Sequence, residues 1–232
     1  MDFFEAIEKR RSVRKYTEKP VPAEVINKAL DAALKAPNSS NLQPWEFYWV
    51  RSKEKKEILV KACLDQNAAK TAGELIVAVA RMDTWDRNRK ILLQHMSQSA
   101  ALPKGVSDYY NKIIPFIYRH DPFHLMALFR FIILNCVGMF RPMFRKPAWR
   151  HEQFEVVTKT TALACENFML AIAAQSYGSC PMEGFDESRV KYLLNLNSKS
   201  HIVMVISVGE TADTGILGDQ FRIDRKLTVF EI

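Results

Sequence analysis

The sequence predicts a single α+β domain built around one sheet. Short runs rich in β-branched and aromatic residues occur among longer segments with helical periodicity, and no sequence repeat or linker divides the 232 residues. With 48% hydrophobic and 25% charged residues, the composition is that of an ordinary globular domain, which excludes a disordered chain or a disulfide-stapled miniprotein. We therefore expect one domain over 1–232, with 83–151 as a helical insertion or cap.

Each element is predicted from the spacing of its apolar residues and from the residues that flank it. Pro22 lies near the first turn of one helix and Pro37 ends it. The helix from Glu152 to about Tyr177 is apolar in nearly every direction, which places it inside a domain or a dimer. Gly178 is positioned to end that helix in a left-handed turn. The sequence predicts helices at 2–10, 22–36, 53–64, 152–177 and 187–194, and strands at 45–50, 75–80, 202–209 and 226–232.

The positive charge is concentrated in the middle of the chain. Residues 104–150 carry a net charge of +6 out of a total of +7, which can attract phosphates, anionic lipid or nucleic acid at long range. Within this region the apolar stretch 124–144 is interrupted by Arg130, Asn135 and Arg141, so we expect no transmembrane helix. We expect this stretch to form a helix, which either packs in the core, covers a ligand cavity, joins a subunit interface or lies on a membrane surface.

The four cysteines favour a reducing compartment. They show no CxxC or Cys/His spacing, so neither a zinc site nor a disulfide framework is predicted. Cys136 and Cys165 lie in apolar helical runs, where we expect buried, inert thiols. Because the N-terminus also lacks the features of a signal peptide, we expect a cytoplasmic protein.

Three of the four candidate binding segments are polar or basic stretches in the first part of the chain or at its end. If residues 10–15 are extended, Arg10, Ser12 and Arg14 share one face while Val13 packs inward, which suits a phosphate dianion. A solvated basic run is the alternative. The polar loop 36–45 can present Asn and Gln amides to a heterocycle, or it can be an ordinary turn. Near the C-terminus Arg222 and Arg225 are either cofactor contacts or surface residues.

The fourth segment, 178–186, links the long buried helix to the next one. Its two glycines and one proline indicate a backbone that approaches something closely, with main-chain N–H groups free to donate. Glu183 could act there through its amide rather than its carboxylate.

Taken together, these segments resemble the nitroreductase family of flavin enzymes. The motifs are RRSVR at 10–14, SSNLQPW at 39–45, PMEGFD at 181–186 and a C-terminal arginine. The resemblance covers about 3–82 and 152–232, while 83–151 has no counterpart that we can place. It implies a central mixed or antiparallel sheet flanked by helices, and a homodimer with FMN bound at two interface sites.

The resemblance also implies which residues hold the flavin. Arg10, Ser12, Arg14 and Arg222, with Arg11 beside them, would hold the phosphate and the pyrimidine edge, and the neighbouring subunit would contribute Ser39, Ser40, Asn41 and Gln43. The turn of Pro181, Met182, Glu183 and Gly184 would lie over the isoalloxazine. Asn67 marks the region of a further amide and a lysine, whose register the motifs do not fix. Gln220 replaces a lysine of many relatives, which leaves the phosphate more dependent on Arg222 and Arg225.

The function implied is transfer of hydride from NAD(P)H through flavin N5 to an electron-poor acceptor such as a nitroaromatic or a quinone. No side-chain nucleophile, catalytic residue or metal is needed, so the five histidines are given no role. Two alternatives remain. One is a flavin enzyme of the same family with different chemistry, reductive dehalogenation or flavin fragmentation; the other is a flavin-free basic module that binds lipid or nucleic acid. For the leading hypothesis we expect a small-molecule acceptor and no nucleic acid.

Overall fold

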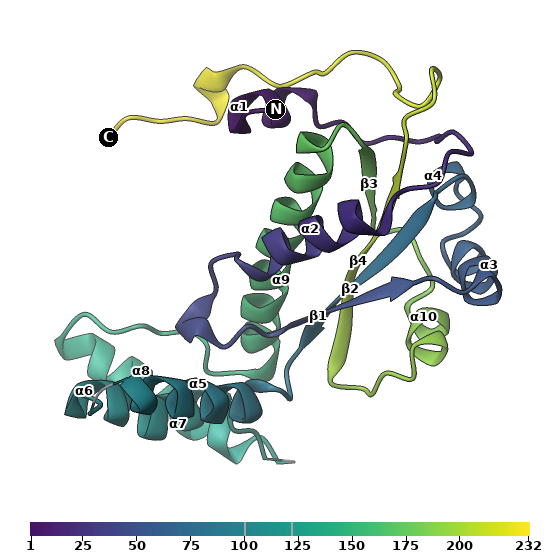
Figure 1. Ribbon diagram of the computed structural model, residues 1–232. Helices are drawn as coiled ribbons and strands as arrows, with labels where there is room; N and C mark the ends of the chain where they lie inside the picture. Colours follow the sequence, from purple (N-terminus) through teal and green to yellow (C-terminus); the bar gives the residue numbers. More distant parts are fainter. Residues whose placement is uncertain (100, 122) are drawn as a thin grey trace.

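The computed structural model describes residues 1–99, 101–121 and 123–232, and an antiparallel four-stranded sheet forms its centre (Figure 1). The strands are β1 (Trp45–Val50), β2 (Glu74–Arg81), β3 (Gly178–Met182) and β4 (Ser200–Gly209), in the order β1-β2-β4-β3. The α+β class is therefore confirmed. β3 was not predicted as a strand, because Pro181 lies within it. This proline is tolerated since β3 is at the edge of the sheet.

Helices cover both faces of this sheet and also extend beyond it. Those predicted outside the middle segment all form, within a few residues of the expected ends. The helical elements are α1 (Phe3–Lys9), α2 (Ala23–Leu34), η1 (Ser39–Asn41), α3 (Lys53–Ala62), α4 (Asn67–Lys70), α5 (Trp85–Ser99), α6 (Lys104–Asp108), η2 (Tyr109–Ile113), α7 (Ile114–Tyr118), α8 (Leu125–Phe140), α9 (Arg150–Ala174), α10 (Glu187–Leu193) and η3 (Arg225–Leu227). Of these η2 is a π-helix, while η1 and η3 are short 3-10 turns.

The alternation of side chains along β2 divides the core into two layers. Ile76, Ala78 and Ala80 pack with α2 and α9 on one face, whereas Val77 and Val79 pack with α3 and α10 on the other. Because helices cover both of its faces, β2 has the unbroken apolar run LIVAVA between its polar end residues.

The helix α9 is the main core helix, and it packs against α2 and one face of the sheet (Figure 1). By length and composition it is the one helix of the described chain that could cross a membrane. Half of the relevant window is buried, however, and Phe168 and Ile172 lie fully inside the core with α2 and the sheet. These contacts are those of a core helix.

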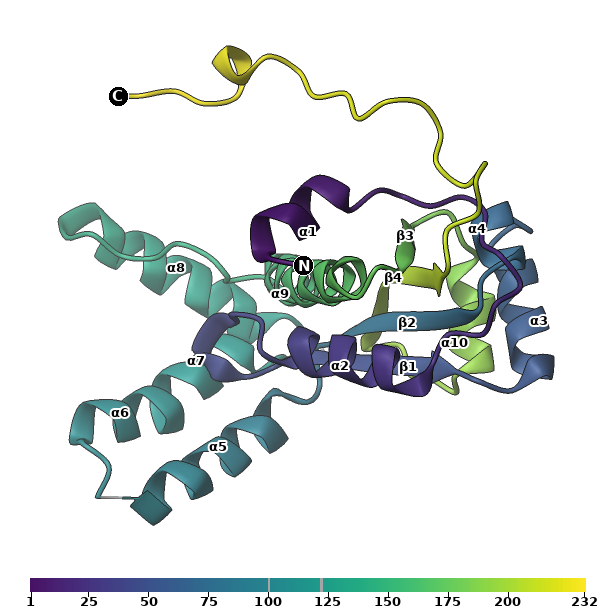
Figure 2. The same cartoon turned by 45° about the horizontal axis from the view of Figure 1, so that its top comes forward.

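The segment α5–α8, which we call the arm, projects away from the sheet (Figure 2). Its centre is Arg130, which is fully buried. The guanidinium donates to the main-chain oxygens of Ala148 at 3.0 Å, Phe116 at 2.9 Å and Arg119 at 2.6 Å. The residue that interrupts the apolar run in the sequence thus joins α8 to α7 and to the start of α9.

Two predictions are wrong, one about the end of α9 and one about the burial of a cysteine. The left-handed residue that ends α9 is Ser176 with φ 65°, not Gly178. Gly178 is required for close approach instead, because a Cβ there would lie 2.5 Å from Thr211 Oγ1 and 2.7 Å from Val13 Cγ2. Cys136, expected to be buried, is exposed on α8; Cys165 is buried, and burial raises the pKa of its thiol to about 12.

The predicted strand at 226–232 does not form in the described chain. After Gly209 the chain leaves the sheet, and residues 217–232 run exposed across the outside of the molecule (Figure 2). A β pattern gives a strand only where another strand offers hydrogen-bond partners, and this segment meets none among the described residues. Phe221, Leu227 and Phe230 are consequently 78%, 69% and 73% exposed.

Candidate flavin site

Arg10, Arg11, Ser12, Arg14 and Arg222 line one cavity of about 340 Å³, which we call the arginine cradle. The helix α1 ends before Arg10, which is extended. Val13 is buried, and its N–H donates to Ser179 O at 3.0 Å, while Ser12 pairs with Ser179 in an isolated bridge. The chain therefore runs along β3 with Arg10, Ser12 and Arg14 on the cavity side, as the alternation predicts. Arg11 lines the cavity as well, which the alternation does not predict.

Most of the guanidinium donors in the cradle are uncommitted. Arg10 lies 3.8 Å from Glu166, Arg11 donates to Gly218 O at 2.8 Å, and Arg222 donates to Phe221 O at 2.7 Å. The side chain of Arg14 makes no hydrogen bond or ion pair within the described residues. Several forked cations around one hydroxyl are a donor set that fits a phosphate dianion, so these residues fit the phosphate end of FMN.

The turn after β3 lies beside the cradle because Ser179 pairs with Ser12. Glu183 and Gly184 are exposed at the tip of this turn. Gly184 O accepts a hydrogen bond from Gln66 Nε2 at 2.7 Å, which ties the turn to the beginning of α4 and so brings Asn67 close to it. The segment 178–186 thus contacts the chain of the cradle at Ser179 and the Asn67 region at Gly184.

The resemblance implies an amide and a lysine in the region of α4 without fixing their register, and two polar residues at α4 were therefore not named from the sequence. Gln66 is its N-cap residue and holds the turn through Gly184. Lys70 follows Asn67 by one helical turn, and its ammonium lies 3.9 Å from Asp65. The three-residue spacing from Asn67 would have indicated that Lys70 shares its face.

The segment Asn38–Gln43, which we call the amide loop, is held in an unusual conformation. Ser40, Asn41 and Gln43 have φ of 57°, 50° and 46°, a left-handed region that non-glycine residues seldom adopt. The loop closes on itself where Gln43 N donates to Asn38 Oδ1 at 2.9 Å. Backbone strain of this kind persists only where the surroundings fix it.

Side chains of the arm provide that support. Asn88 Nδ2 donates to Leu42 O at 2.8 Å and to Gln43 O at 3.2 Å. Tyr110 donates its hydroxyl to Ser40 O at 3.1 Å, and the hydroxyls of Ser40 and Tyr109 lie 2.6 Å apart. None of these supporting residues was predicted, because their positions have no signal in the sequence beyond a polar or aromatic side chain in a helical segment.

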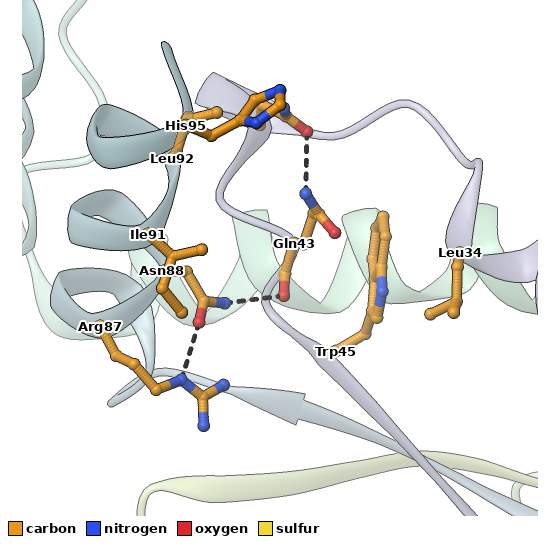
Figure 3. Close-up of a pocket in the computed structure, with 9 residues that line it drawn as sticks. Leu34, Gln43, Trp45, Arg87, Asn88, Ile91, Leu92 and His95 are labelled. Atoms are coloured by element: carbon orange, nitrogen blue, oxygen red, sulfur yellow. Dashed lines mark hydrogen bonds between the residues drawn. The ribbon is translucent and has the colours of Figure 1, made fainter. Parts of the chain in front are cut away.

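The amide loop does not line the arginine cradle. Asn41 and Gln43 line a separate cavity of about 460 Å³ together with α5 (Figure 3). Within one chain, then, the structure brings the other three predicted segments together and leaves the loop apart. Arg225 begins η3 and is not among the residues that line the cradle, whereas Gln220 is among them.

The histidines do not gather into a site in the described chain. His120 uses both ring nitrogens, one with Gln153 and one at 3.4 Å from Arg130 Nη2, and burial lowers its pKa. His201 pairs with Glu187 at 3.1 Å, and His95 lines the cavity beside the amide loop. In the turn region, burial raises the pKa of the Cys180 thiol, which keeps it protonated near neutral pH.

Comparison with known proteins identifies the family. The family model described as "Nitroreductase family" matches residues 7–210, so the match runs through the middle segment that the motifs left unplaced. A protein of Thermus thermophilus named NADH dehydrogenase is 27% identical over 217 residues, which cover 94% of this chain and 90% of that protein.

Solved structures agree with the fold. The protein ydfN of Bacillus subtilis superposes with a TM-score of 0.76 at 21% identity, covering 99% of this chain and 98% of that one. A nitroreductase-type protein of Exiguobacterium sibiricum, solved in complex with FMN, gives a TM-score of 0.72 at 22% identity, covering 100% and 98%. With the family match over most of its length, the chain belongs to the nitroreductase family of FMN-dependent oxidoreductases.

Proposed function

We propose that this protein is a homodimeric NAD(P)H oxidoreductase that reduces electron-poor acceptors such as nitroaromatics or quinones with FMN as its cofactor. The observation that carries the proposal is the arginine cradle, in which uncommitted guanidinium groups lie beside an exposed glycine turn. The FMN-bound relative and the NADH dehydrogenase name of another relative support the cofactor and the donor.

In this proposal the cradle binds the FMN phosphate through Arg10, Ser12 and Arg222. Main-chain N–H groups near Glu183 and Gly184 orient the ring, and Arg14 places a positive charge close to the side that becomes anionic on reduction. Bound FMN would supply the redox chemistry, which is transfer of a hydride equivalent from NAD(P)H to the acceptor. The protein therefore contributes binding, orientation and charge.

A second protomer completes the site. The amide loop lines a cavity other than the cradle of its own chain, which supports a site in which Ser39, Ser40, Asn41 and Gln43 contact the flavin of a neighbouring subunit. Apolar residues of α1 and of the C-terminal tail are exposed in the single chain, among them Phe4 and Phe230. Exposed apolar surface of this kind marks a contact between proteins. None of the four cysteines is in a disulfide, which fits the cytoplasm.

The test begins with the purified protein. We expect flavin absorbance, anaerobic bleaching by NADH or NADPH, and recovery of the absorbance on addition of a nitroaromatic or a quinone. A colourless protein that takes up no added FMN would overturn the proposal. If the flavin is reduced but no such acceptor reoxidises it, the acceptor class is wrong, and dehalogenation and flavin fragmentation become the alternatives to assay.

A residue-level test uses Arg222→Ala, with Lys28→Ala as the control. Lys28 is an exposed cation on α2 that pairs only with Glu24 in the described chain. Because one charge-assisted contact contributes about 1.5–3 kcal/mol, the FMN dissociation constant should rise roughly 10- to 100-fold in Arg222→Ala. Equal flavin retention in the two variants would place the phosphate elsewhere.

A further inference from the structure

The cavity beside the amide loop, which we call the α5 cavity, has the size and lining of a small-molecule site. Its volume is about 460 Å³, within the range that drug-sized ligands occupy. Trp45, Ile91 and Leu92 provide apolar walls, and Gln43 and Asn41 provide amides from the loop. Figure 3 shows Gln43 and the Trp45 ring projecting between α5 and Leu34.

One side of this cavity is a stripe along α5. Arg87, Ile91 and His95 are spaced four residues apart, so they lie on one helical face, and all three line the cavity. Arg87 and His95 mark the two ends of the stripe in Figure 3, with the apolar Ile91 between them. A ligand lying along α5 would therefore meet an apolar middle and a cationic end.

Arg87 is the one arginine or lysine among the described residues that line the α5 cavity. None of its described lining residues carries a carboxylate. The nearest acid on the same helix, Asp86, is bound by Arg89 at 2.8 Å and by Lys90 at 2.7 Å. The positive charge at the cavity is thus not neutralised by its surroundings.

The donors of Arg87 are available to a ligand. Its Nε donates to Asn88 Oδ1 at 2.9 Å, which fixes the orientation of the planar group. Neither Nη has a hydrogen bond or an ion pair within the described residues, and the side chain is exposed. Two parallel N–H groups on an oriented guanidinium match the two oxygens of a carboxylate or a phosphate.

We propose that the α5 cavity admits the substrate of the flavin reaction and that Arg87 selects substrates bearing an anionic oxygen group, a carboxylate or a phosphate. This inference rests on the proposed function, since it is the amide loop that would place the cavity next to the flavin of the neighbouring subunit. The anionic group has two possible sources: the acceptor, as in an aromatic carboxylate, or the donor, through the additional phosphate of NADPH.

The experiment compares matched substrate pairs in the FMN-loaded enzyme. For the acceptor, kcat/KM is measured with 4-nitrobenzoate and with its methyl ester at saturating NADH. For the donor, kcat/KM is measured with NADPH and with NADH using the methyl ester. Arg87→Gln is the test variant, Arg87→Lys keeps the charge without the fork, and Lys90→Gln removes an exposed cation of α5 that does not line the cavity.

We expect the ratio of acid to ester, or of NADPH to NADH, to fall about tenfold or more in Arg87→Gln. That loss corresponds to about 1.4 kcal/mol of selective binding. Arg87→Lys should restore part of the ratio, and Lys90→Gln should leave it at the wild-type value. Which of the two ratios falls identifies the source of the anionic group.

Other outcomes overturn the inference. If neither ratio changes in Arg87→Gln, Arg87 does not select an anionic group. An equal fall in Lys90→Gln would mean general electrostatic attraction by α5 rather than recognition in the cavity. Failure of the proposed function is distinguishable from both, because the wild-type protein would then lack flavin or would reduce neither the acid nor the ester.

Discussion

The arginine cradle and the amide loop are both predicted to bind the flavin, yet they are held in different ways. The cradle is fixed to the sheet by main-chain pairing, since Ser12 and Val13 run along Ser179 of β3. The loop has three residues with left-handed φ and depends on side chains of the arm, above all Asn88. The sequence motifs therefore indicate both binding segments, but they do not show that the cradle is held by main-chain pairing and the loop by side chains of the arm.

The largest effect is expected from breaking the arm at Arg130. Arg130→Ala removes a fully buried guanidinium and leaves the oxygens of Phe116, Arg119 and Ala148 without their donor, which should cost about 3 kcal/mol. Hydrogen exchange should show α7 and α8 opening while β2 and β4 remain protected.

Two further variants sharpen this prediction. Arg130→Met keeps much of the volume but has no donors, so it should behave like Arg130→Ala. Arg141→Ala removes an exposed arginine at the end of α8 and should leave the exchange pattern unchanged. Wild-type protection of the arm in Arg130→Ala would show that apolar packing, not the buried arginine, holds it.

A matched pair of glycines tests how rigid the cradle is, with a glycine of the arm as the control. In Gly178→Ala the new methyl would lie 2.5 Å from Thr211 Oγ1 and 2.7 Å from Val13 Cγ2, beside the cradle, so overpacking should lower the free energy of unfolding by about 1–3 kcal/mol. Gly105, in α6 of the arm, has no atom within 4 Å of such a methyl. Gly105→Ala should be neutral, or stabilising by up to about 1 kcal/mol.

Urea denaturation of both variants gives the measurement. A midpoint for Gly178→Ala at or above the wild-type value would mean that the chain near Val13 can move, and the cradle would then not be the rigid region.

Much of the fold is predictable from the sequence because hydrophobic periodicity reports burial. The strand LIVAVA and the helix around Phe168 carry that signal without ambiguity. The segment 226–232 also contains β-branched and aromatic residues, but it meets no strand partner in the described chain, and composition alone could not decide this. β3 was missed because the proline rule does not tell an edge strand from a turn.

The residue types of the site are predictable from the sequence, but the hydrogen bonds that hold its segments in place are not. The alternation of Arg10, Ser12 and Arg14 around the buried Val13 follows from extended backbone and was predicted. The contacts from Asn88 and Gln66 join segments distant in sequence, and a single sequence has no signal for such pairs. These long-range hydrogen bonds from side chains to the main chain could be identified only from the structure.

The dependence of the amide loop on the arm can be tested at Asn88. Asn88→Ala removes the donors to Leu42 O and Gln43 O, so the strained loop loses about 1–2 kcal/mol of local support and kcat/KM should fall roughly 5- to 30-fold. The control is Gln94→Ala, an exposed residue of the same helix whose side chain does not contact the loop. Unchanged kcat/KM in Asn88→Ala would show that the loop keeps its conformation without the arm.

The smallest effect concerns Asp83, where β2 leads into the arm. Arg81 binds its carboxylate through two hydrogen bonds of 3.0 and 3.1 Å, and this contact lowers the pKa of Asp83 from 3.8 to about 2. A lowered pKa in the folded state stabilises the protein above about pH 4, and the contribution is lost as the pH falls toward 2. Allowing for partial exposure, it amounts to about 1–2 kcal/mol.

Asp83→Asn should therefore flatten the pH dependence of the unfolding free energy between pH 4 and pH 2, whereas Asp31→Asn, at an exposed carboxylate of α2, should not. If both variants keep the wild-type slope, the ion pair does not contribute to the junction, and the buried Arg130 contacts must carry the link between sheet and arm.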